Sequence, residues 1–362
     1  MKTTEILVVG AGPAGLMAAI HAAEAGAQVL LVERADRLGG QLIKQTHKFF
    51  GSKAEYAGER GIQIAEKLIT ASKENSGITT WQKATVLGIY PDGVVTISHD
   101  GEFCTVKPKK IIIATGASEK TMAFPNNDLP GIYGAGAVQT LMNVHGVLPG
   151  KRLLMVGAGN IGVIVAYQLL QAGVEVVGIV EAGPQVGGYL VHAAKLARHG
   201  VPIYTSHSIK SAHGDSCLEG VTICKLDKNW QPIEGTDQYI PVDGLCLAVG
   251  LSPLTELLWQ AGCEMKYAGE LGGYVPLRDA NLKTTHGDIY VAGDVSGVEE
   301  ASAAMVEGKI VGLYVASILG RKTESFTKDF QVAKSQLSAL RSGPSSMKIC
   351  SGLSKVVLKE AQ

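Results

Sequence analysis

Two short apolar runs, each followed by a glycine-rich turn, organise the chain. Residues 6–9 (Ile-Leu-Val-Val) form a run of strand length that ends in the turn 10–15 (Gly-Ala-Gly-Pro-Ala-Gly). Beyond this turn, apolar residues recur at helical spacing as far as Ala23, and an apolar stretch resumes after Gly26, at 28–33. The pattern predicts a strand, a tight turn, a helix and a second strand, joined by a right-handed parallel crossover.

The same pattern recurs further along the chain. Residues 153–156 lead into the turn 157–162 (Gly-Ala-Gly-Asn-Ile-Gly), a helical pattern follows through Gln171, and a strand is expected at 176–181. The two glycine turns begin 147 residues apart. This separation indicates two nucleotide-binding units rather than one.

Two other segments differ from this pattern. Residues 78–106 alternate between apolar and polar positions around a turn at 91–93 (Pro-Asp-Gly), which predicts a small antiparallel layer over the first sheet. From about Thr323 onwards Ser, Lys and Gln accumulate, and residues 323–362 carry a local charge of +3. Apolar residues there can still line one face of a helix that ends at 342–344 (Ser-Gly-Pro). We expect either an appendage that docks on this molecule or on a partner, or a solvated tail.

The composition excludes several classes of protein. Apolar residues make up 46% of the 362 residues and charged residues 18%, enough for a large core, and the 45 glycines follow no fixed period. Lys plus Arg equals Asp plus Glu at 33 each, so the chain lacks the basic charge on which nucleic-acid binding relies. We find no basic leader and no uninterrupted apolar run of about 18 residues, and therefore expect neither a signal peptide nor a membrane span. The six cysteines are scattered, which favours reduced thiols and a cytoplasmic protein without a metal site.

The first glycine turn has the context required of a dinucleotide-binding fingerprint. Gly10 permits the tight turn, Gly12 lets a pyrophosphate approach the backbone, and Gly15 lets the helix pack against the strand. The start of the following helix offers free N–H groups and the positive end of its dipole to phosphates. Glu33 lies 18 residues beyond Gly15 and would accept hydrogen bonds from ribose hydroxyls.

The second turn meets the same requirement, because Glu181 lies 19 residues beyond Gly162. A carboxylate there binds the free 2′-hydroxyl of NAD and repels the 2′-phosphate of NADP. The segment that follows, 182–188, contains no Arg or Lys, so we expect NAD(H) rather than NADP(H). The alternatives are an adenine nucleotide held without redox use, or a pocket without a ligand.

Five motifs in order resemble those of flavoproteins with two dinucleotide-binding domains, the superfamily that includes glutathione and thioredoxin reductases. Besides the two glycine turns, they are 111–116 (Ile-Ile-Ile-Ala-Thr-Gly), 247–253 (Leu-Ala-Val-Gly-Leu-Ser-Pro) and 285–294, which ends in Ala-Gly-Asp. The resemblance covers residues 5 to about 320. It implies an α/β fold of two Rossmann-like domains with doubly wound parallel sheets, each with a small antiparallel layer, in a three-layer ββα arrangement.

The resemblance also implies an order of domains and a set of site residues. An FAD-binding domain would comprise 1–117 and 278–322, an inserted NAD-binding domain 118–277, and a C-terminal appendage 323–362. In the superfamily the late aspartate, here Asp294, holds the ribityl and pyrophosphate region of FAD; a solvated aspartate that caps the next helix is the alternative. The candidates for FAD are Gly10, Gly12, Pro13, Ala14, Gly15, Glu33, Arg34, Gly40, Gln41, Thr115, Gly116, Gly293, Asp294 and Ala301. Those for NAD are Gly157, Gly159, Asn160, Ile161, Gly162, Glu181 and Gly250.

The chain departs from the disulfide reductases of this superfamily in one respect. Those enzymes carry a redox-active cysteine pair either soon after the first ribose acid or inside the NAD domain. Here residues 39–48 contain no cysteine and the NAD domain offers no close pair; if the register is shared, Leu42 and His47 occupy the two thiol positions. Dithiol exchange is therefore disfavoured. Lys44 and His47 become the candidate catalytic groups, Lys44 as an anchor for an acidic substrate or for flavin charge, and His47 as a proton carrier near neutral pH. A structural histidine bonded to the backbone is the alternative for His47.

A closer likeness is to the small FAD/NAD-type subunits of heteromeric amine-oxidising dehydrogenases: opine oxidase, hydrogen cyanide synthase and sarcosine oxidase. This likeness rests on 39–41 (Gly-Gly-Gln), 131–139 and 148–152 (Leu-Pro-Gly-Lys-Arg). Some of those relatives carry a cysteine-rich iron–sulfur element near the C-terminus, where this sequence has Cys350 alone. We therefore expect no cluster on this chain, while a separate partner could provide one.

The leading hypothesis is an FAD-dependent pyridine nucleotide oxidoreductase without a redox-active disulfide, which transfers hydride between NAD(H) and bound FAD. Its electrons would pass to a small-molecule substrate or acceptor that the sequence does not identify. The alternative enzyme is an electron-transfer subunit of a heteromeric amino-acid, opine or hydroxy-acid dehydrogenase. A nucleotide-sensing module without turnover is the non-catalytic alternative, and a homodimer is the default of the superfamily.

Overall fold

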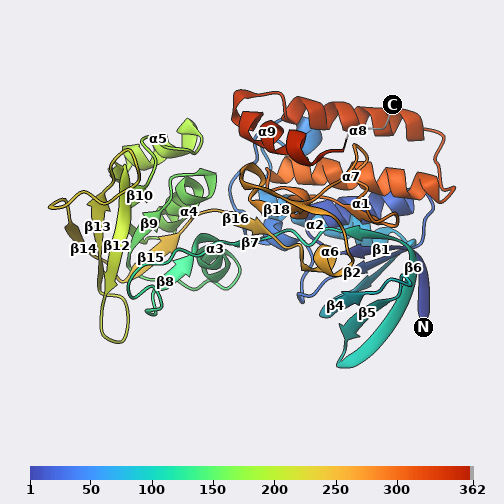
Figure 1. Cartoon of the computed structure of the whole chain (residues 1–362), viewed down its shortest axis with the longest axis horizontal. Coiled ribbons are helices and arrows are strands. Elements are labelled where there is room, and N and C mark those ends of the chain that lie inside the picture. Colours follow the sequence, from blue (N-terminus) through green and yellow to red (C-terminus); the bar gives the residue numbers. More distant parts are fainter. Residues whose placement is uncertain (359–362) are drawn as a thin grey trace. The chain divides into compact units, whose positions relative to one another are not determined.

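The computed structural model describes residues 1–358 and divides into two units (Figure 1). Unit 1 comprises Met1–Ser118 together with the chain from Leu251 onwards, and unit 2 comprises Glu119–Gly250. The chain crosses between the units twice, at the strands β7 (Ala117–Glu119) and β16 (Leu251–Pro253). These two crossing strands pair with each other.

The second crossing lies earlier than the expected domain boundary at residue 277. The segment 251–277, which contains β16, α6 (Glu256–Gln260), β17 (Met265–Ala268) and β18 (Gly273–Pro276), belongs to unit 1. Leu258 and Cys263 are buried in the same apolar cluster as Leu7 of the first strand. These apolar contacts fix the segment to the first sheet, so the inserted unit ends at Gly250 and not at residue 277.

The sheet of unit 1 has a parallel part and an antiparallel part. The parallel strands run in the order β3 (Ile78–Trp81), β2 (Val29–Val32), β1 (Lys2–Val9), β6 (Glu102–Ile113) and β19 (Ile289–Val291). The first half of β6 also pairs antiparallel with β5 (Val95–His99), and β5 with β4 (Ala84–Ile89). The β4–β5 hairpin turns at 91–93 as predicted. Residues 78–81, by contrast, join the parallel sheet, because they pair in register with β2.

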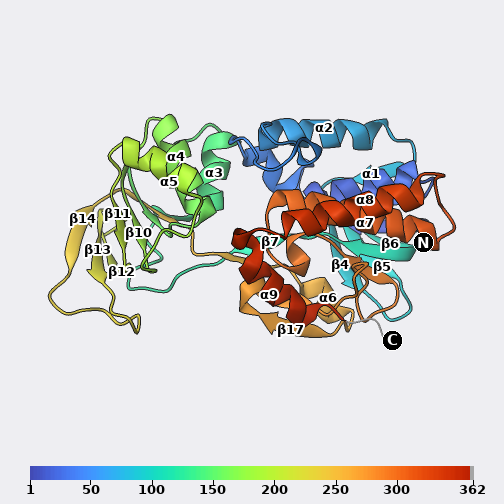
Figure 2. The ribbon, with the colours of Figure 1, turned by 90° about the horizontal axis from the view of Figure 1, so that it is seen from above.

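Helices α1 (Pro13–Glu24), α7 (Ala301–Ile318) and α8 (Phe326–Leu340) are stacked in that order on one face of this sheet (Figures 1 and 2). Along β1, Ile6 and Val8 are buried in the cluster on the helical side, and Leu7 and Val9 in the cluster on the other side. Helix α2 (Gly61–Glu74) also packs on α1. Among the described residues, α7 is the one helix long and apolar enough to cross a membrane, and 72% of it is buried inside the structure.

The C-terminal appendage docks on unit 1 through α8 and α9 (Met347–Val356). On α8, Phe330 stacks on Tyr314 of α7 with 6.0 Å between ring centroids, and Ala333 is fully buried. Leu353 and Val356 of α9 pack in a small apolar cluster with β17 and β18. Of the two expectations for this segment, docking on the same molecule therefore holds for residues 326–358, and 359–362 lie outside the described residues.

Unit 2 repeats the parallel arrangement on a smaller scale. Its strands run in the order β11 (Ile203–Thr205), β10 (Glu175–Glu181), β9 (Arg152–Val156), β15 (Gly244–Leu247) and β8 (Ile132–Gly134), all parallel. Helices α3 (Ala135–Asn143), α4 (Asn160–Gln171) and α5 (Leu190–Arg198) share an apolar cluster with one face. An antiparallel sheet of β12 (His207–His213), β13 (Gly220–Lys225) and β14 (Gln238–Pro241) shares a cluster with the other face. Each unit is therefore an α/β sandwich around a parallel sheet.

Candidate functional site

The turn between β1 and α1 is closed by backbone contacts that only glycine permits. The N–H of Gly10 donates to the carbonyl of Val32 at 2.8 Å, and Gly10 has a φ of +99°. A Cβ at this position would lie 2.4 Å from the carbonyl oxygen of Ala114, at the end of β6. The turn is therefore held at the carboxyl ends of three neighbouring parallel strands, which is where α/β sheets bind ligands.

Glu33 fixes the same turn from the end of β2. One carboxylate oxygen accepts from the N–H of Ala11 (2.8 Å) and the other from the N–H of Ala35 (2.9 Å). Each carboxylate oxygen has a second lone pair, so a sugar hydroxyl could still donate to it. Glu33 thus has a structural role within the turn and remains suited to the ribose role that its spacing predicts.

The start of α1 is open towards ligand. Gly12 is the N-cap, no side chain of the described residues caps the helix there, and the first turn holds no acidic residue. The segment that follows β2 crosses beside it: Gly39 donates to the carbonyl of Ala11 at 2.8 Å, and a Cβ on Gly40 would lie 2.7 Å from the Cα of Gly12. Residues 39–40 thus form a backbone strap, a segment of main chain that crosses the start of α1. A helix start whose first N–H groups have no side-chain cap suits an anionic diphosphate.

Unit 2 builds the same arrangement with matching contacts. Gly157 also has a φ of +99° and donates to the carbonyl of Val180 at 2.7 Å. Glu181 accepts from the N–H groups of Ala158 and Gly183, each at 2.7 Å. Gly188 donates to the carbonyl of Ala158 at 2.8 Å, as Gly39 does to Ala11 in unit 1. Asn160 adds one contact, accepting from the N–H of Tyr189 at 2.8 Å.

The straps themselves, 39–40 and 187–188, complete the pattern of each site. In both units two consecutive glycines stand six and seven residues after the strand-end glutamate. This spacing can be read from the sequence alone. It could have identified residues 187–188, which were not among the candidates for NAD.

The loop after β19 contains the predicted flavin aspartate. Asp294 accepts a long hydrogen bond from the N–H of Glu299 (3.5 Å), and burial, followed by the nearby carboxylates of Glu307, Glu299 and Glu300, raises the pKa of Asp294 to about 7. Such a perturbed carboxyl is typical of a functional position. The loop leads directly into α7, which begins at Ala301, another of the candidates for FAD.

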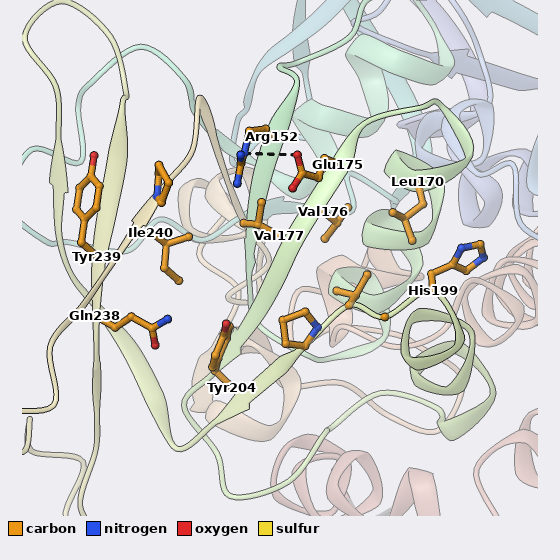
Figure 3. A pocket seen from close by; sticks show the side chains of 14 residues that line it. Arg152, Leu170, Glu175, Val176, Val177, His199, Tyr204, Gln238, Tyr239 and Ile240 are labelled. Carbon is orange, nitrogen blue, oxygen red and sulfur yellow. Dashed lines mark ion pairs between the residues drawn. The ribbon is translucent and has the colours of Figure 1, made fainter.

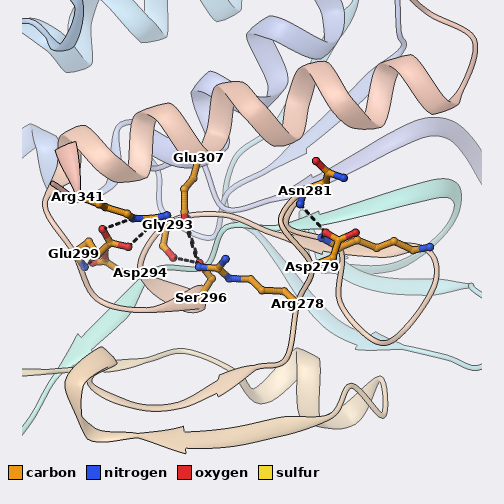
Figure 4. Close-up of polar contacts among 10 residues, drawn as sticks. Arg278, Asp279, Asn281, Gly293, Asp294, Ser296, Glu299, Glu307 and Arg341 are labelled. Atoms are coloured by element: carbon orange, nitrogen blue, oxygen red, sulfur yellow. Dashed lines mark hydrogen bonds and ion pairs between the residues drawn. The ribbon is translucent and has the colours of Figure 1, made fainter. Parts of the chain in front are cut away.

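Beneath this loop lies a buried carboxylate that sequence reasoning missed. Glu307 of α7 accepts from the N–H of Gly293 (2.9 Å), from the hydroxyl of Ser296 (3.1 Å) and from the guanidinium of Arg278 (3.3 Å) (Figure 4). Burial alone would raise the pKa of Glu307, but the neighbouring guanidinium groups lower it. A carboxylate in the mostly apolar helix 301–318, whose one other charged residue is Lys309, was the available signal.

The remaining predicted residues lie at different places relative to the two glycine turns. Arg34 and Gln41 are exposed, and Gly116 and Gly250 follow the ends of β6 and β15 in left-handed conformations. The hydroxyl of Thr115 donates to the carbonyl of Leu254 at 2.7 Å, so it serves the connection between segments. The other predicted members occupy the two turns and helix starts: Pro13, Ala14 and Gly15 in unit 1, and Gly159, Ile161 and Gly162 in unit 2.

The two candidate catalytic side chains follow the unit 1 strap. Lys44 ends a short helical turn, η1 (Gly40–Lys44), and is half-buried. His47 is also half-buried, and its ring stacks on Phe49 with 5.6 Å between centroids. Leu42, the first of the two expected thiol positions, is fully buried in the helical-side core.

A separate hollow of about 500 Å³ lies in unit 2, between Arg152, Glu175, Tyr204 and Tyr239 (Figure 3). Arg152 and Glu175 form an ion pair at 3.5 Å. They stand at the starts of β9 and β10, whereas the glycine turn follows the end of β9. The hollow is therefore at the opposite edge of the sheet from the nucleotide site and takes no part in it.

Comparisons with known proteins agree with this geometry. The pyridine nucleotide-disulphide oxidoreductase family matches residues 4–308. An opine oxidase subunit of Agrobacterium tumefaciens (strain Ach5) is 30% identical over 336 residues, which cover 85% of this chain and 64% of that protein. Hydrogen cyanide synthase subunit HcnB of Pseudomonas protegens is 28% identical over 328 residues, 85% of this chain and 69% of its own length. Thioredoxin reductase of T. acidophilum has a TM-score of 0.72 at 22% identity, covering 88% of this chain and 99% of that one.

Two parallel-sheet units, each with a glycine turn fixed by a strand-end carboxylate, define a two-domain, Rossmann-like oxidoreductase fold. The chain belongs to the pyridine nucleotide-disulphide oxidoreductase family, and this membership implies that it binds FAD and a pyridine nucleotide. The residues fit such groups, because each unit presents an uncapped helix start beside a carboxylate. The chain spans slightly less than two thirds of the opine oxidase polypeptide that it matches.

Proposed function

We propose that the chain is an FAD-dependent oxidoreductase that exchanges hydride between NAD(H) and FAD bound in unit 1. The observation that carries this proposal is the repetition of one site in both units, down to the hydrogen bonds of Glu33 and Glu181. Family membership supports a flavin for the first site, and the second site then suits the nicotinamide nucleotide. When bound, the flavin ring supplies the hydride chemistry, while the protein supplies binding, orientation and electrostatics.

In unit 1, the uncapped start of α1 would hold the pyrophosphate and Glu33 the adenosine ribose. Asp294 would accept hydrogen bonds from the polyol chain. Its own pKa near 7 means that a ligand hydroxyl donating to it would favour the ionised form. Together these groups would orient the nucleotide along the carboxyl ends of β1, β2 and β6.

In unit 2, Glu181 is proposed to select NAD(H) over NADP(H). Its two oxygens are already fixed by the N–H groups of Ala158 and Gly183, so the carboxylate cannot swing away to admit a 2′-phosphate without breaking both bonds. Replacing it by serine removes the repulsion while keeping a small hydrogen-bonding group. The E181S variant should therefore narrow the preference for NADH over NADPH by about tenfold or more.

The proposed function also assigns roles to two side chains beyond the strap. Lys44 is proposed to bind an acidic substrate or to balance negative charge on the reduced flavin. His47 is proposed to hold or move a proton near neutral pH. No cysteine stands in residues 39–48, so electrons are proposed to leave without a redox-active disulfide.

An anaerobic titration tests the proposal. Purified protein loaded with FAD should lose its visible flavin absorption on addition of NADH, and NADPH should bleach it more slowly. The E181S variant should bring the two rates together. A wild-type protein that takes up FAD but is bleached by neither nucleotide would contradict hydride exchange, and one that takes up no FAD would contradict the flavin site itself.

A second candidate function is an electron-transfer subunit of a heteromeric dehydrogenase for amino acids, opines or hydroxy acids. It is favoured by the names of the relatives, which are subunits of opine oxidase and hydrogen cyanide synthase. A partner dehydrogenase or an iron–sulfur protein would then carry part of the electron path. Size-exclusion chromatography of the protein from its native cells should show it in a larger complex, whereas a catalytically active lone chain would argue against this candidate.

A further inference from the structure

The two helices of the C-terminal appendage are both linked to one buried carboxylate, α8 directly and α9 through Arg278. Arg341 follows the last residue of α8, and Val356 ends α9. Arg341 bonds Glu307 directly, and Glu307 is the residue of α7 that holds the Gly293–Ser296 loop. Val356 bonds the backbone of Arg278, whose side chain reaches Glu307. The appendage therefore connects to the loop that carries Asp294, although it lies far from it in sequence.

Arg341 makes the first of these connections with its forked guanidinium. It donates to Glu307 at 2.7 Å and to the two carboxylate oxygens of Glu299 at 2.5 and 3.0 Å (Figure 4). The side chain of Arg341 is 16% exposed, that of Glu299 10% and that of Glu307 3%. Hydrogen bonds between ionised, desolvated groups are about twice as strong as neutral ones, and the forked geometry fixes direction as well.

The second connection runs through Arg278. The backbone N–H of Arg278 donates to the carbonyl of Val356 (3.2 Å), and the N–H of Leu358 donates to the carbonyl of Arg278 (2.8 Å). The side chain of Arg278, itself almost wholly buried, donates to Glu307 at 3.3 Å. Each appendage helix therefore ends beside an arginine that neutralises Glu307: α8 at Arg341 itself, and α9 at Val356, which is hydrogen-bonded to the backbone of Arg278.

Glu307 links these two arginines to the loop that carries Asp294, the candidate flavin loop. Its other oxygen accepts from Gly293 and Ser296, one on each side of Asp294, and Glu299 donates its N–H to Asp294 itself. If Arg341 were absent, Glu307 would keep its hydrogen bond from Arg278, but Glu299 would lose the guanidinium that is hydrogen-bonded to it and keep only the electrostatic influence of Arg278. A buried carboxylate without a partner is strongly unfavourable, so the loop would rearrange to expose it.

We propose that Arg341 is a positioning residue for the flavin: from the C-terminal appendage it fixes, through Glu299 and Glu307, the loop that presents Asp294. This inference rests on the proposed flavin site in unit 1. It adds a residue outside the segment 4–308 that matches the family. The appendage then serves to retain the flavin, in addition to covering the apolar face of α7.

The test compares R341Q with R321Q. Arg321 also pairs with a carboxylate of unit 1, Glu5 at 3.1 Å, but is 48% exposed and touches no part of the loop. Flavin-free protein is titrated with FAD, and binding is followed by quenching of flavin fluorescence. R341Q should bind FAD about tenfold more weakly than wild type, since it loses hydrogen bonds to charged groups, and R321Q should stay within about twofold. R341K, which keeps the charge but not the fork, should fall between them.

Two further measurements separate positioning from loss of fold. Amide hydrogen exchange should accelerate in peptides over 289–300 of R341Q, with unit 1 peptides away from the loop, such as those over 29–32 and 78–81, unchanged; a general destabilisation of unit 1 would accelerate exchange in all of them. If R341Q does not fold, the double variant R341M/E299Q removes the cation together with its carboxylate and leaves Arg278 on Glu307. The inference would be overturned if R341Q, or the folded double variant, bound FAD with the same affinity as wild type. A wild type that takes up no FAD would instead overturn the proposed function on which it rests.

Discussion

At two positions the folded chain has room for a methyl group that a bound diphosphate would not tolerate. A Cβ on Gly12 would meet only the Cα of Gly40, at 3.9 Å, and a Cβ on Gly159 would meet nothing within 4 Å. Both glycines are N-caps with ordinary extended backbone angles, so alanine can adopt the same conformation. The need for glycine at these sites is therefore a need of the ligand.

The variants G12A and G159A should separate the two nucleotide sites. The free energy of unfolding of each variant should lie within about 1 kcal/mol of the wild-type value, because no contact is lost and no strained backbone angle is imposed. G12A should lose FAD binding and keep NADH binding, and G159A should do the reverse, which calorimetry with each nucleotide measures. Loss of both ligands in one variant would show that the sites are not independent.

Flavin affinity should depend on pH through Asp294. In the flavin-free chain its pKa is raised to about 7, chiefly by burial. Ligand hydroxyls would donate to the ionised carboxylate, so affinity should be greatest above pH 7 and fall as the pH drops through that value, by up to about tenfold per pH unit. Titrations of flavin-free protein between about pH 5.5 and 8.5, roughly 1.5 pH units on either side of that pKa, check this. D294N should bind more weakly with a flat profile, and an equal slope in D294N would assign the titration elsewhere.

The proposed site in unit 1 depends on the packing of α1 against α7, because α1 starts at the glycine turn and α7 starts at the loop that carries Asp294. A Cβ on Gly308 would lie 2.2 Å from the carbonyl oxygen of Ala14, and one on Gly312 would lie 2.4 Å from that of Ala18. The two helix backbones are in direct contact at these points. Their separation thus sets the distance between the two halves of the flavin site.

G312A should destabilise unit 1 by about 1–3 kcal/mol, because the added methyl group forces α7 away from α1. Thermal and denaturant unfolding measure the change. K309A, on the same helix and partly exposed, is the matched control and should change stability by less than about 0.5 kcal/mol. Equal stability of G312A and wild type would mean that the helices can separate without cost.

Elements formed by local pattern could be predicted from the sequence, and those formed by distant contacts could not. Both glycine turns and the strands beside them follow from short apolar runs and from the spacing of Glu33 and Glu181. The ion pairs around Glu307 join residues from four separate segments, so no local signal contains them. The boundary at Gly250 was missed for the same reason, because Leu258 and Cys263 pack in one apolar cluster with the distant strands β1 and β4.

The whole molecule consists of one continuous and one discontinuous unit. Unit 2, Glu119–Gly250, has apolar clusters on both faces of its sheet, formed entirely from its own residues. We therefore expect a fragment of residues 119–250 to fold alone and to bind NADH with nearly the affinity of the full chain, while taking up no flavin. Circular dichroism and calorimetry test this; a fragment that aggregates or ignores NADH would show that unit 2 needs unit 1.

The pairing of β7 with β16 has a consequence for how such chains can be rebuilt. On the unit 1 side, Leu254 donates to the carbonyl of Gly116 at 3.0 Å, and on the unit 2 side, Lys120 donates to that of Gly250 at 3.0 Å. Entry and exit thus lie one hydrogen bond apart. A short linker from β7 to β16 could therefore replace residues 119–250 without distorting either strand. Another domain whose termini lie close together could be inserted at the same two positions.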